Sequence, residues 1–179
     1  MPREAYDRMV EHGILGPDDK IELLEGRLIV AEPKHSPHAT AVLLVAGALR
    51  DVFVGDWHVR TETPLALGPF SEPEPDVSIV RGDIRDYRAA HPTAAALVVE
   101  VSDSSLRLDR TIKKQIYAAG GIAEYWILNL VTRVLEVYRD PVDTGSMREY
   151  RSVRTFGPDD LVSPLAAPDA TIHVGQLLP

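Results

Sequence analysis

A single glutamate interrupts the most apolar strand candidate of the chain, the segment LVVEV at residues 97–101. A carboxylate buried among apolar neighbours without a partner costs several kcal/mol or is forced into its neutral form. A cation, a hydrogen-bond network or a metal ion must therefore accompany Glu100. A second carboxylate, Asp76, follows Pro75 and begins the apolar segment VSIV at residues 77–80. A side chain at such a strand end can project from the sheet into a cleft.

Two carboxylates from neighbouring strands can bind a divalent metal ion. Together with a backbone carbonyl such as that of Val101, Asp76 and Glu100 would give the oxygen-rich coordination that Mg²⁺ or Mn²⁺ prefers. The structural alternative is that Asp76 caps the entry to its strand and Glu100 pairs with an arginine. Perturbed carboxylates also occur in structural ion-pair networks, so the residue types alone leave both interpretations open.

The helix expected over residues 109–119 supplies an amine and a phenol near these acids. The 3.6-residue period places three apolar residues on its inner face, namely Ile112, Ile116 and Ala119. Asp109, Lys113 and Tyr117 then run down one side of the helix, with Lys113 at the shoulder of the inner face. A lysine beside a metal-bound carboxylate pair can orient or deprotonate an attacking water and stabilise a phosphoryl oxygen. The alternative is an Asp109–Lys113 helix pair worth a few tenths of a kcal/mol.

Histidine and cysteine chemistry is sparse in this sequence. The chain has no cysteine, which excludes disulfides, thiolate zinc sites and cysteine nucleophiles. Its 6 histidines show no HExxH arrangement, so no zinc site is predicted. His38, at the start of an expected helix, is a candidate for the metal cleft or a phosphate. Helix capping or solvent exposure is the alternative.

The composition is that of an ordinary globular protein. The 179 residues are 45% hydrophobic and 26% charged, enough for one domain with a well-formed core. The N-terminal segment is charged, and no stretch approaches the roughly 20 apolar residues of a membrane helix. We therefore expect a soluble, cytoplasmic protein without membrane contacts. Proteins that bind nucleic acids usually present a basic surface to the phosphates, and the formal net charge of −8 is unfavourable for this. It predicts weak, salt-sensitive DNA binding or a need for a partner.

The order of expected elements indicates an α/β protein. Helices are predicted over 3–12, 38–53 and 109–119, a hairpin over 21–32 around Glu25 and Gly26, and strands over 57–67, 77–80, 95–101, 124–130, 133–139, 148–154 and 171–174. In the first helix, Tyr6, Met9 and Val10 are spaced to face inward. We expect a single domain over residues 1–179, of which 141–179 form a less regular C-terminal extension.

Three segments in a fixed order carry a family resemblance: EPDVSIV (74–80), LVVEVSDSS (97–105) and DRTIKKQIYAAGGIAEYWI (109–127). They resemble the Uma-type restriction endonuclease family of the PD-(D/E)XK nuclease superfamily. The upstream segment IELLEGRLIVAEP (21–33), followed by His38, is similar as well. The resemblance spans roughly residues 3–140.

The resemblance implies a restriction-endonuclease-like core, in which helices flank a mixed β-sheet. Asp76 would be the aspartate of the first half-motif and Glu100 the acid of the second. The superfamily pattern has a lysine two residues after that acid, where this chain has Ser102. Lys113 occupies the position from which this family supplies its lysine. Glu22 matches a recurrent family glutamate, although the exposed face of a hairpin strand is an equal alternative.

The resulting hypothesis is a metal-dependent endonuclease that hydrolyses DNA phosphodiester bonds. Mg²⁺ or Mn²⁺ would be held by Asp76, Glu100 and the Val101 carbonyl, with Lys113 assisting the attack of water. Two other functions remain open: a non-catalytic binding or regulatory member of the same fold, and a hydrolase of a smaller phosphoester. A homodimer is compatible with the resemblance, which does not require it.

Overall fold

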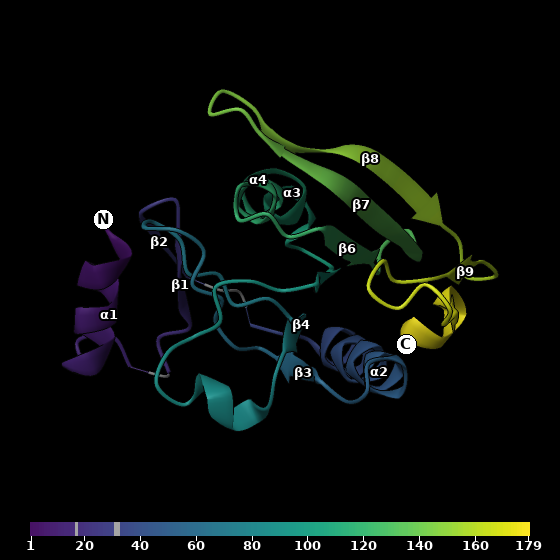
Figure 1. The fold of residues 1–179 in the computed structure, drawn as a ribbon, viewed down its shortest axis with the longest axis horizontal. Coiled ribbons are helices and arrows are strands. Elements are labelled where there is room, and N and C mark those ends of the chain that lie inside the picture. Colours follow the sequence, from purple (N-terminus) through teal and green to yellow (C-terminus); the bar gives the residue numbers. More distant parts are fainter. Residues whose placement is uncertain (17, 31–32) are drawn as a thin grey trace.

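The fold is built on a six-stranded mixed sheet (Figure 1). A computed structural model describes residues 1–16, 18–30 and 33–179, so residues 31 and 32 of the quoted upstream segment lie outside the described residues. The strands follow one another across the sheet in chain order: β3 (Trp57–Thr61), β4 (Val77–Arg81), β5 (Leu97–Ser102), β6 (Glu124–Asn129), β7 (Val134–Asp143) and β8 (Arg148–Phe156). The β5–β6 pair is parallel, and the other neighbouring pairs are antiparallel.

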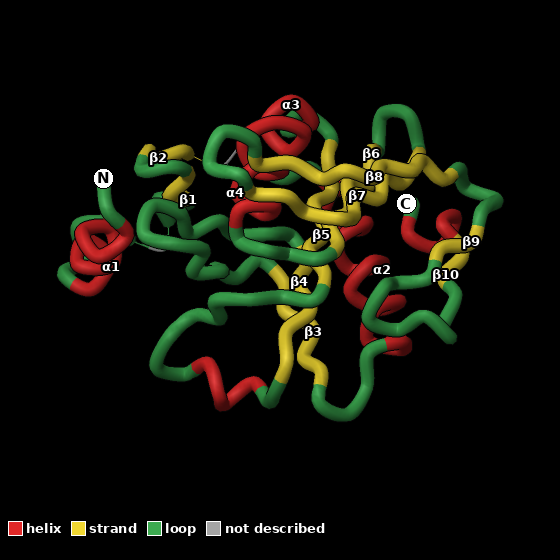
Figure 2. The backbone as a smooth tube through the Cα atoms, turned by 45° about the horizontal axis from the view of Figure 1, so that its top comes forward, coloured by secondary structure: helices red, strands yellow, loops and turns green. Residues whose placement is uncertain are grey.

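Helices cover both faces of this sheet, as the family resemblance implies (Figure 2). Helix α2 (Ser36–Val52) packs on one face. The crossover between the parallel strands packs on the other and consists of α3 (Leu106–Leu108), a π-helical turn (Asp109–Lys113) and α4 (Lys114–Ala119). A crossover of this kind is needed because parallel strands cannot be joined by a tight turn.

The alternation of side chains along β5 decides where Glu100 points. Leu97, Val99 and Val101 belong to the core on the α2 side, whereas Val98 belongs to the core on the α4 side. Successive side chains of a strand point to opposite faces. Glu100 therefore shares the face of Val98, and it points toward the helix that carries Lys113.

The N-terminal elements and the last residues of the chain lie on opposite sides of the molecule (Figure 1). The N-terminal elements are α1 (Arg3–Glu11) and a hairpin of β1 (Ile21–Leu24) and β2 (Arg27–Val30). Glu25 and Gly26 adopt φ angles of 48° and 77°, as a two-residue hairpin turn requires. Tyr6 is buried and its hydroxyl donates to the Ile21 carbonyl at 2.6 Å. The predicted inward orientation of Val10 is wrong, since this side chain is 48% exposed.

The C-terminal residues complete the sheet and then cover α2. Residues 148–156, within the segment expected to be less regular, form the edge strand β8. The chain continues through the short pair β9 (Leu161–Val162) and β10 (Ile172–His173) and the 3-10 helix η3 (Val174–Leu177). A second 3-10 helix, η1 (Ile84–Tyr87), lies between β4 and β5. No helix within the described ranges has both the length and the apolarity of a membrane span.

Candidate active site

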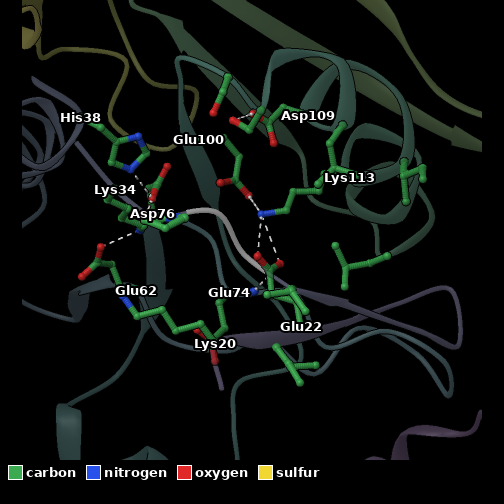
Figure 3. A pocket seen from close by; sticks show the side chains of 18 of the residues that line it. Lys20, Glu22, Lys34, His38, Glu62, Glu74, Asp76, Glu100, Asp109 and Lys113 are labelled. Atoms are coloured by element: carbon green, nitrogen blue, oxygen red, sulfur yellow. Dashed lines mark hydrogen bonds and ion pairs between the residues drawn. The ribbon is translucent and has the colours of Figure 1, made fainter. Parts of the chain in front are cut away.

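A pocket of about 980 Å³ is lined by most of the side chains singled out from the sequence. It lies where the N-terminal elements meet the ends of β4 and β5 and the π-helical turn, and Figure 3 shows it from close by. Its acidic lining residues are Glu22, Glu62, Glu74, Asp76, Glu100, Asp103 and Asp109, and its lysine and arginine lining residues are Lys20, Lys34, Arg107 and Lys113. The pocket is therefore rich in negative charge.

Lys113 lies at the centre of one group of these side chains (Figure 3). Its ammonium is buried and lies 3.1 Å from Glu100 Oε1 and 3.1 Å from Glu22 Oε2. The Tyr117 hydroxyl donates to the same Glu100 oxygen at 2.6 Å. The alternative of an Asp109–Lys113 helix pair does not describe this site, because Lys113 instead joins two carboxylates from different strands.

Burial sets the protonation of this group. It raises the pKa of Glu100 to about 8, and the charge of Lys113 only partly opposes that effect. Burial by itself would lower the pKa of Lys113, but the neighbouring carboxylates, Glu100 foremost, raise this pKa above its usual value. Lys113 therefore stays a cation at neutral pH, while Glu100 readily accepts a proton.

Asp76 belongs to a second group, on the other side of the pocket. Its Oδ2 accepts the Val101 N–H at 2.7 Å, and its Oδ1 lies 2.7 Å from Lys34 Nζ and 3.1 Å from His38 Nε2. Burial tends to raise the pKa of Asp76, but the His38 hydrogen bond and the Lys34 charge outweigh it and lower this pKa to about 2. Asp76 is therefore an anion at neutral pH.

The π-helical turn corrects the predicted inner face of the helix. Ile116 is buried as expected, but Ala119 is exposed, and the polar residues Asp109, Lys113 and Tyr117 are buried instead. A π turn contains one more residue than an α-helical turn, and it therefore changes which side chains face inward. Such turns are frequent at functional sites. The Ser102 and Ser105 hydroxyls each donate to Asp109 Oδ2 at 2.6 Å.

Glu22 is buried beside Lys113. Its alternative position, on the exposed face of a hairpin strand, is therefore wrong. The Oε2 atom of Glu22 also accepts the backbone N–H of Glu74 at 3.1 Å. Burial raises the pKa of Glu74, and the charge of Glu22 adds to the effect. The acids of the pocket therefore lie close enough to repel one another.

The structure brings all predicted side chains into one pocket or its wall. Asp76, Glu100, Lys113, Glu22 and His38 line it, and Tyr117 contacts Glu100 from behind. The pairing of Glu100 with an arginine, the structural alternative, is replaced by a lysine and a tyrosine. The catalytic roles themselves stay predictions.

Sequence reasoning missed Lys34, Glu62 and Glu74. Glu74 lies two residues before Asp76 in the acidic run EPEPD, which was a usable signal. Lys34 and Glu62 lie outside the helices and strands, where no periodicity reports the direction of a side chain. Their approach to Asp76 depends on how distant segments pack.

The oxygen donors of the pocket suit a hard divalent ion. Asp76 immediately precedes β4 and Glu100 lies in the neighbouring antiparallel strand β5, and the charge of Asp76 contributes to the raised pKa of Glu100. The Val101 N–H reaches Asp76, and the carbonyl of an extended residue faces the same side as its N–H. Two carboxylates and a carbonyl match the preferences of Mg²⁺ and Mn²⁺. Within the described residues, no three His, Cys, Asp or Glu side chains lie together as metal ligands, so a site here would rest on two carboxylates and a backbone carbonyl.

Comparisons with known proteins agree with this architecture. The model of the family described as "Uma2: Putative restriction endonuclease" matches residues 3–175. The crystal structure of "a putative nuclease belonging to DUF820" from Anabaena variabilis superposes with a TM-score of 0.74 at 17% sequence identity, covering 93% of this chain and 94% of that chain. At this identity the likeness shows a shared fold. Among curated proteins, no match was found.

Proposed function

This chain belongs to the Uma2 family, described as putative restriction endonucleases, and from that premise we propose that it is a Mg²⁺- or Mn²⁺-dependent phosphodiesterase that cuts DNA. The observation that carries the proposal is the convergence of three side chains on one pocket: Asp76 before β4, Glu100 in β5 and Lys113 in the π-helical turn. The family and the nuclease-like fold support a nuclease; the metal, the substrate and the residue roles are the proposal.

Asp76, Glu100 and the Val101 carbonyl would hold the ion. When bound there, a divalent ion supplies Lewis-acid polarisation of a phosphoryl oxygen. The Val101 N–H and Tyr117 hydroxyl fix the two carboxylates from behind. Donor groups held by their own hydrogen bonds keep the geometry that catalysis requires.

Lys113 acts through its charge. Because the surrounding carboxylates raise its pKa, its ammonium keeps its proton at neutral pH and is unsuited to be a general base. It stabilises negative charge that develops on the phosphate during attack by water. Glu100 and Glu22 hold the ammonium in place from two sides.

A hydrolase of a smaller phosphoester is the second candidate. The acidic lining of the pocket and the net charge of −8 both repel an extended polyanion more strongly than a compact one. Assays of the protein with bis(p-nitrophenyl) phosphate and with plasmid DNA separate the two candidates. Turnover of the small diester without any DNA cleavage supports the second.

The first test is plasmid cleavage in Mn²⁺ and Mg²⁺ by the parent protein and by Asp76→Asn. We expect the substitution to lower the cleavage rate by about a hundredfold or more, because it removes one of two anionic oxygen donors. Asp51→Asn, an identical change on the exposed side of α2, controls for the loss of a charge and should cleave like the parent. Equal cleavage by Asp76→Asn contradicts the proposal. If calorimetry detects no Mn²⁺ binding to the parent, the result favours a non-catalytic member of the same fold.

A further inference from the structure

Lys34 lines the pocket but has no role in the proposed hydrolysis. Lys34 Nζ lies 2.7 Å from Asp76 Oδ1 and 2.6 Å from Glu62 Oε1, so one ammonium bridges two carboxylates (Figure 3). Its side chain is 33% exposed, compared with 7% for Asp76 and 52% for Glu62. The bridge therefore joins a buried acid to one at the pocket mouth.

Lys34 forms a salt bridge with Asp76, the carboxylate that would bind the metal ion. Asp76 Oδ2 is engaged by the Val101 N–H, and Oδ1 by Lys34 and His38. An ammonium and a divalent ion on one carboxylate oxygen would lie within a few ångströms of each other, where like charges repel strongly in a partly buried site. A divalent ion bound at Asp76 Oδ1 would therefore displace Lys34.

Glu62 gives the displaced ammonium a second partner. The Glu62 N–H donates to the Asp76 backbone carbonyl at 3.1 Å, and Glu62 has a left-handed φ of 50°. This contact between backbone atoms keeps the Glu62 backbone beside Asp76 and does not involve the Asp76 carboxylate. Lys34 can leave Asp76 by a small side-chain movement and still keep a salt bridge.

We propose that Lys34 is an internal competitor for the metal ion: its ammonium binds the Asp76 carboxylate in the metal-free protein and shifts to Glu62 when a divalent ion binds. Lys34 is thus a positioning residue. It keeps the buried Asp76 compensated and oriented before the metal arrives, and it sets the metal concentration at which the site fills. This inference rests on the proposed function, because it concerns the same metal site.

The test is Mn²⁺ affinity, measured by calorimetry and by the electron paramagnetic resonance signal of free Mn²⁺. Lys34→Met should bind Mn²⁺ about tenfold more tightly, because the competing charge is removed. Lys34→Arg, which keeps that charge, should stay within about threefold of the parent. Lys20→Met removes the charge of another pocket lysine, and it too should change affinity by less than about threefold.

Glu62→Gln is a second variant, in which Mn²⁺ affinity should change in the opposite direction from that in Lys34→Met. Without its alternative partner, Lys34 remains on Asp76, and Mn²⁺ binding should weaken about fivefold or more. Asp103→Asn, which removes another acid of the pocket lining, controls for net charge and should weaken binding less. Thermal unfolding of each variant shows whether it is folded.

The outcomes separate this inference from the proposed function. If the parent binds Mn²⁺ in a manner that depends on Asp76, but Lys34→Met binds no more tightly, the competitor role is wrong and the metal site stands. If Lys34→Met binds Mn²⁺ where the parent does not, the competitor role is supported. If neither protein binds Mn²⁺, the metal site fails and this inference fails with it.

Discussion

The two central carboxylates of the pocket lie on one sheet, yet their surroundings have opposite effects. Lys34 and His38 both face Asp76, and its pKa is lowered to about 2. Glu100 shares a single ammonium, Lys113, with Glu22, and its pKa is raised to about 8. Both carboxylates are buried, so burial alone cannot explain the difference.

Burial raises the pKa of both carboxylates, and the difference shows that the cations within reach decide whether this effect is overcome. On the Asp76 side, two nitrogen atoms contact one carboxylate oxygen. On the Glu100 side, one ammonium contacts two carboxylates, and the charges of Asp109 and Asp76 add repulsion. The Glu100 side therefore has more acids than cations, and a divalent ion bound there would take the place of the proton on Glu100.

The largest effect is expected for Lys113→Met, which removes the only ammonium within reach of both Glu100 and Glu22 in the described structure. Breaking a buried ion pair by removing one partner typically destabilises a protein by about 3–5 kcal/mol. Urea denaturation at pH 7 should show a loss of this size. Lys114→Met, the same change at the half-buried neighbour, should cost less than about 1 kcal/mol. Equal losses in the two variants would show that Glu100 and Glu22 do not depend on Lys113.

A smaller effect is expected in the pH dependence of stability. The pKa of Glu100 is raised from 4.5 to about 8, so the folded protein binds this proton more tightly than the unfolded chain. This contribution to stability is fully present below about pH 4.5 and is lost as pH rises toward 8. Asp76 has the opposite sign: its contribution is present above about pH 3.8 and is lost as pH falls through about 2.

Glu100→Gln isolates the Glu100 contribution. The free energy of unfolding of the parent should fall between pH 5 and pH 8, on the order of 2 kcal/mol of that fall coming from Glu100. The variant should lack this part of the slope in urea titrations at both pH values. Glu149→Gln on the exposed side of β8 should follow the parent. If the free energy of unfolding changes equally with pH in the parent and in Glu100→Gln, the pKa of Glu100 is not raised by its burial and its acidic neighbours.

The smallest effect concerns the hydroxyl that supports Glu100. Tyr117→Phe removes the 2.6 Å hydrogen bond to Glu100 Oε1 while keeping the ring in the core. Loss of one such bond in a buried site should cost about 1–2 kcal/mol, measurable by chemical denaturation. Tyr87→Phe removes a surface hydroxyl and should cost less than about 0.5 kcal/mol. If the two changes are equivalent, Tyr117 supports the core and not the carboxylate.

Much of the fold could be predicted because it follows from local patterns. The apolar runs of β4, β5 and β6 and the turn at Glu25 and Gly26 were read from residue types alone, and the structure confirms them. The inner face of the helix that carries Lys113 could not be predicted, because a π turn changes the 3.6-residue period on which the prediction rested. The place of residues 148–156 at the sheet edge also depends on pairing with β7.

The sequence by itself determined that a glutamate in an apolar strand must have a partner, and it identified Asp76, Glu100 and Lys113 as candidate site residues. Only the tertiary structure decided which cation reaches which acid. Lys34 reaches Asp76 across 42 residues of chain, and Lys113 reaches Glu22 across 91. Electrostatic interactions depend on distance through space and on burial, and residue spacing along the chain determines neither for segments so far apart.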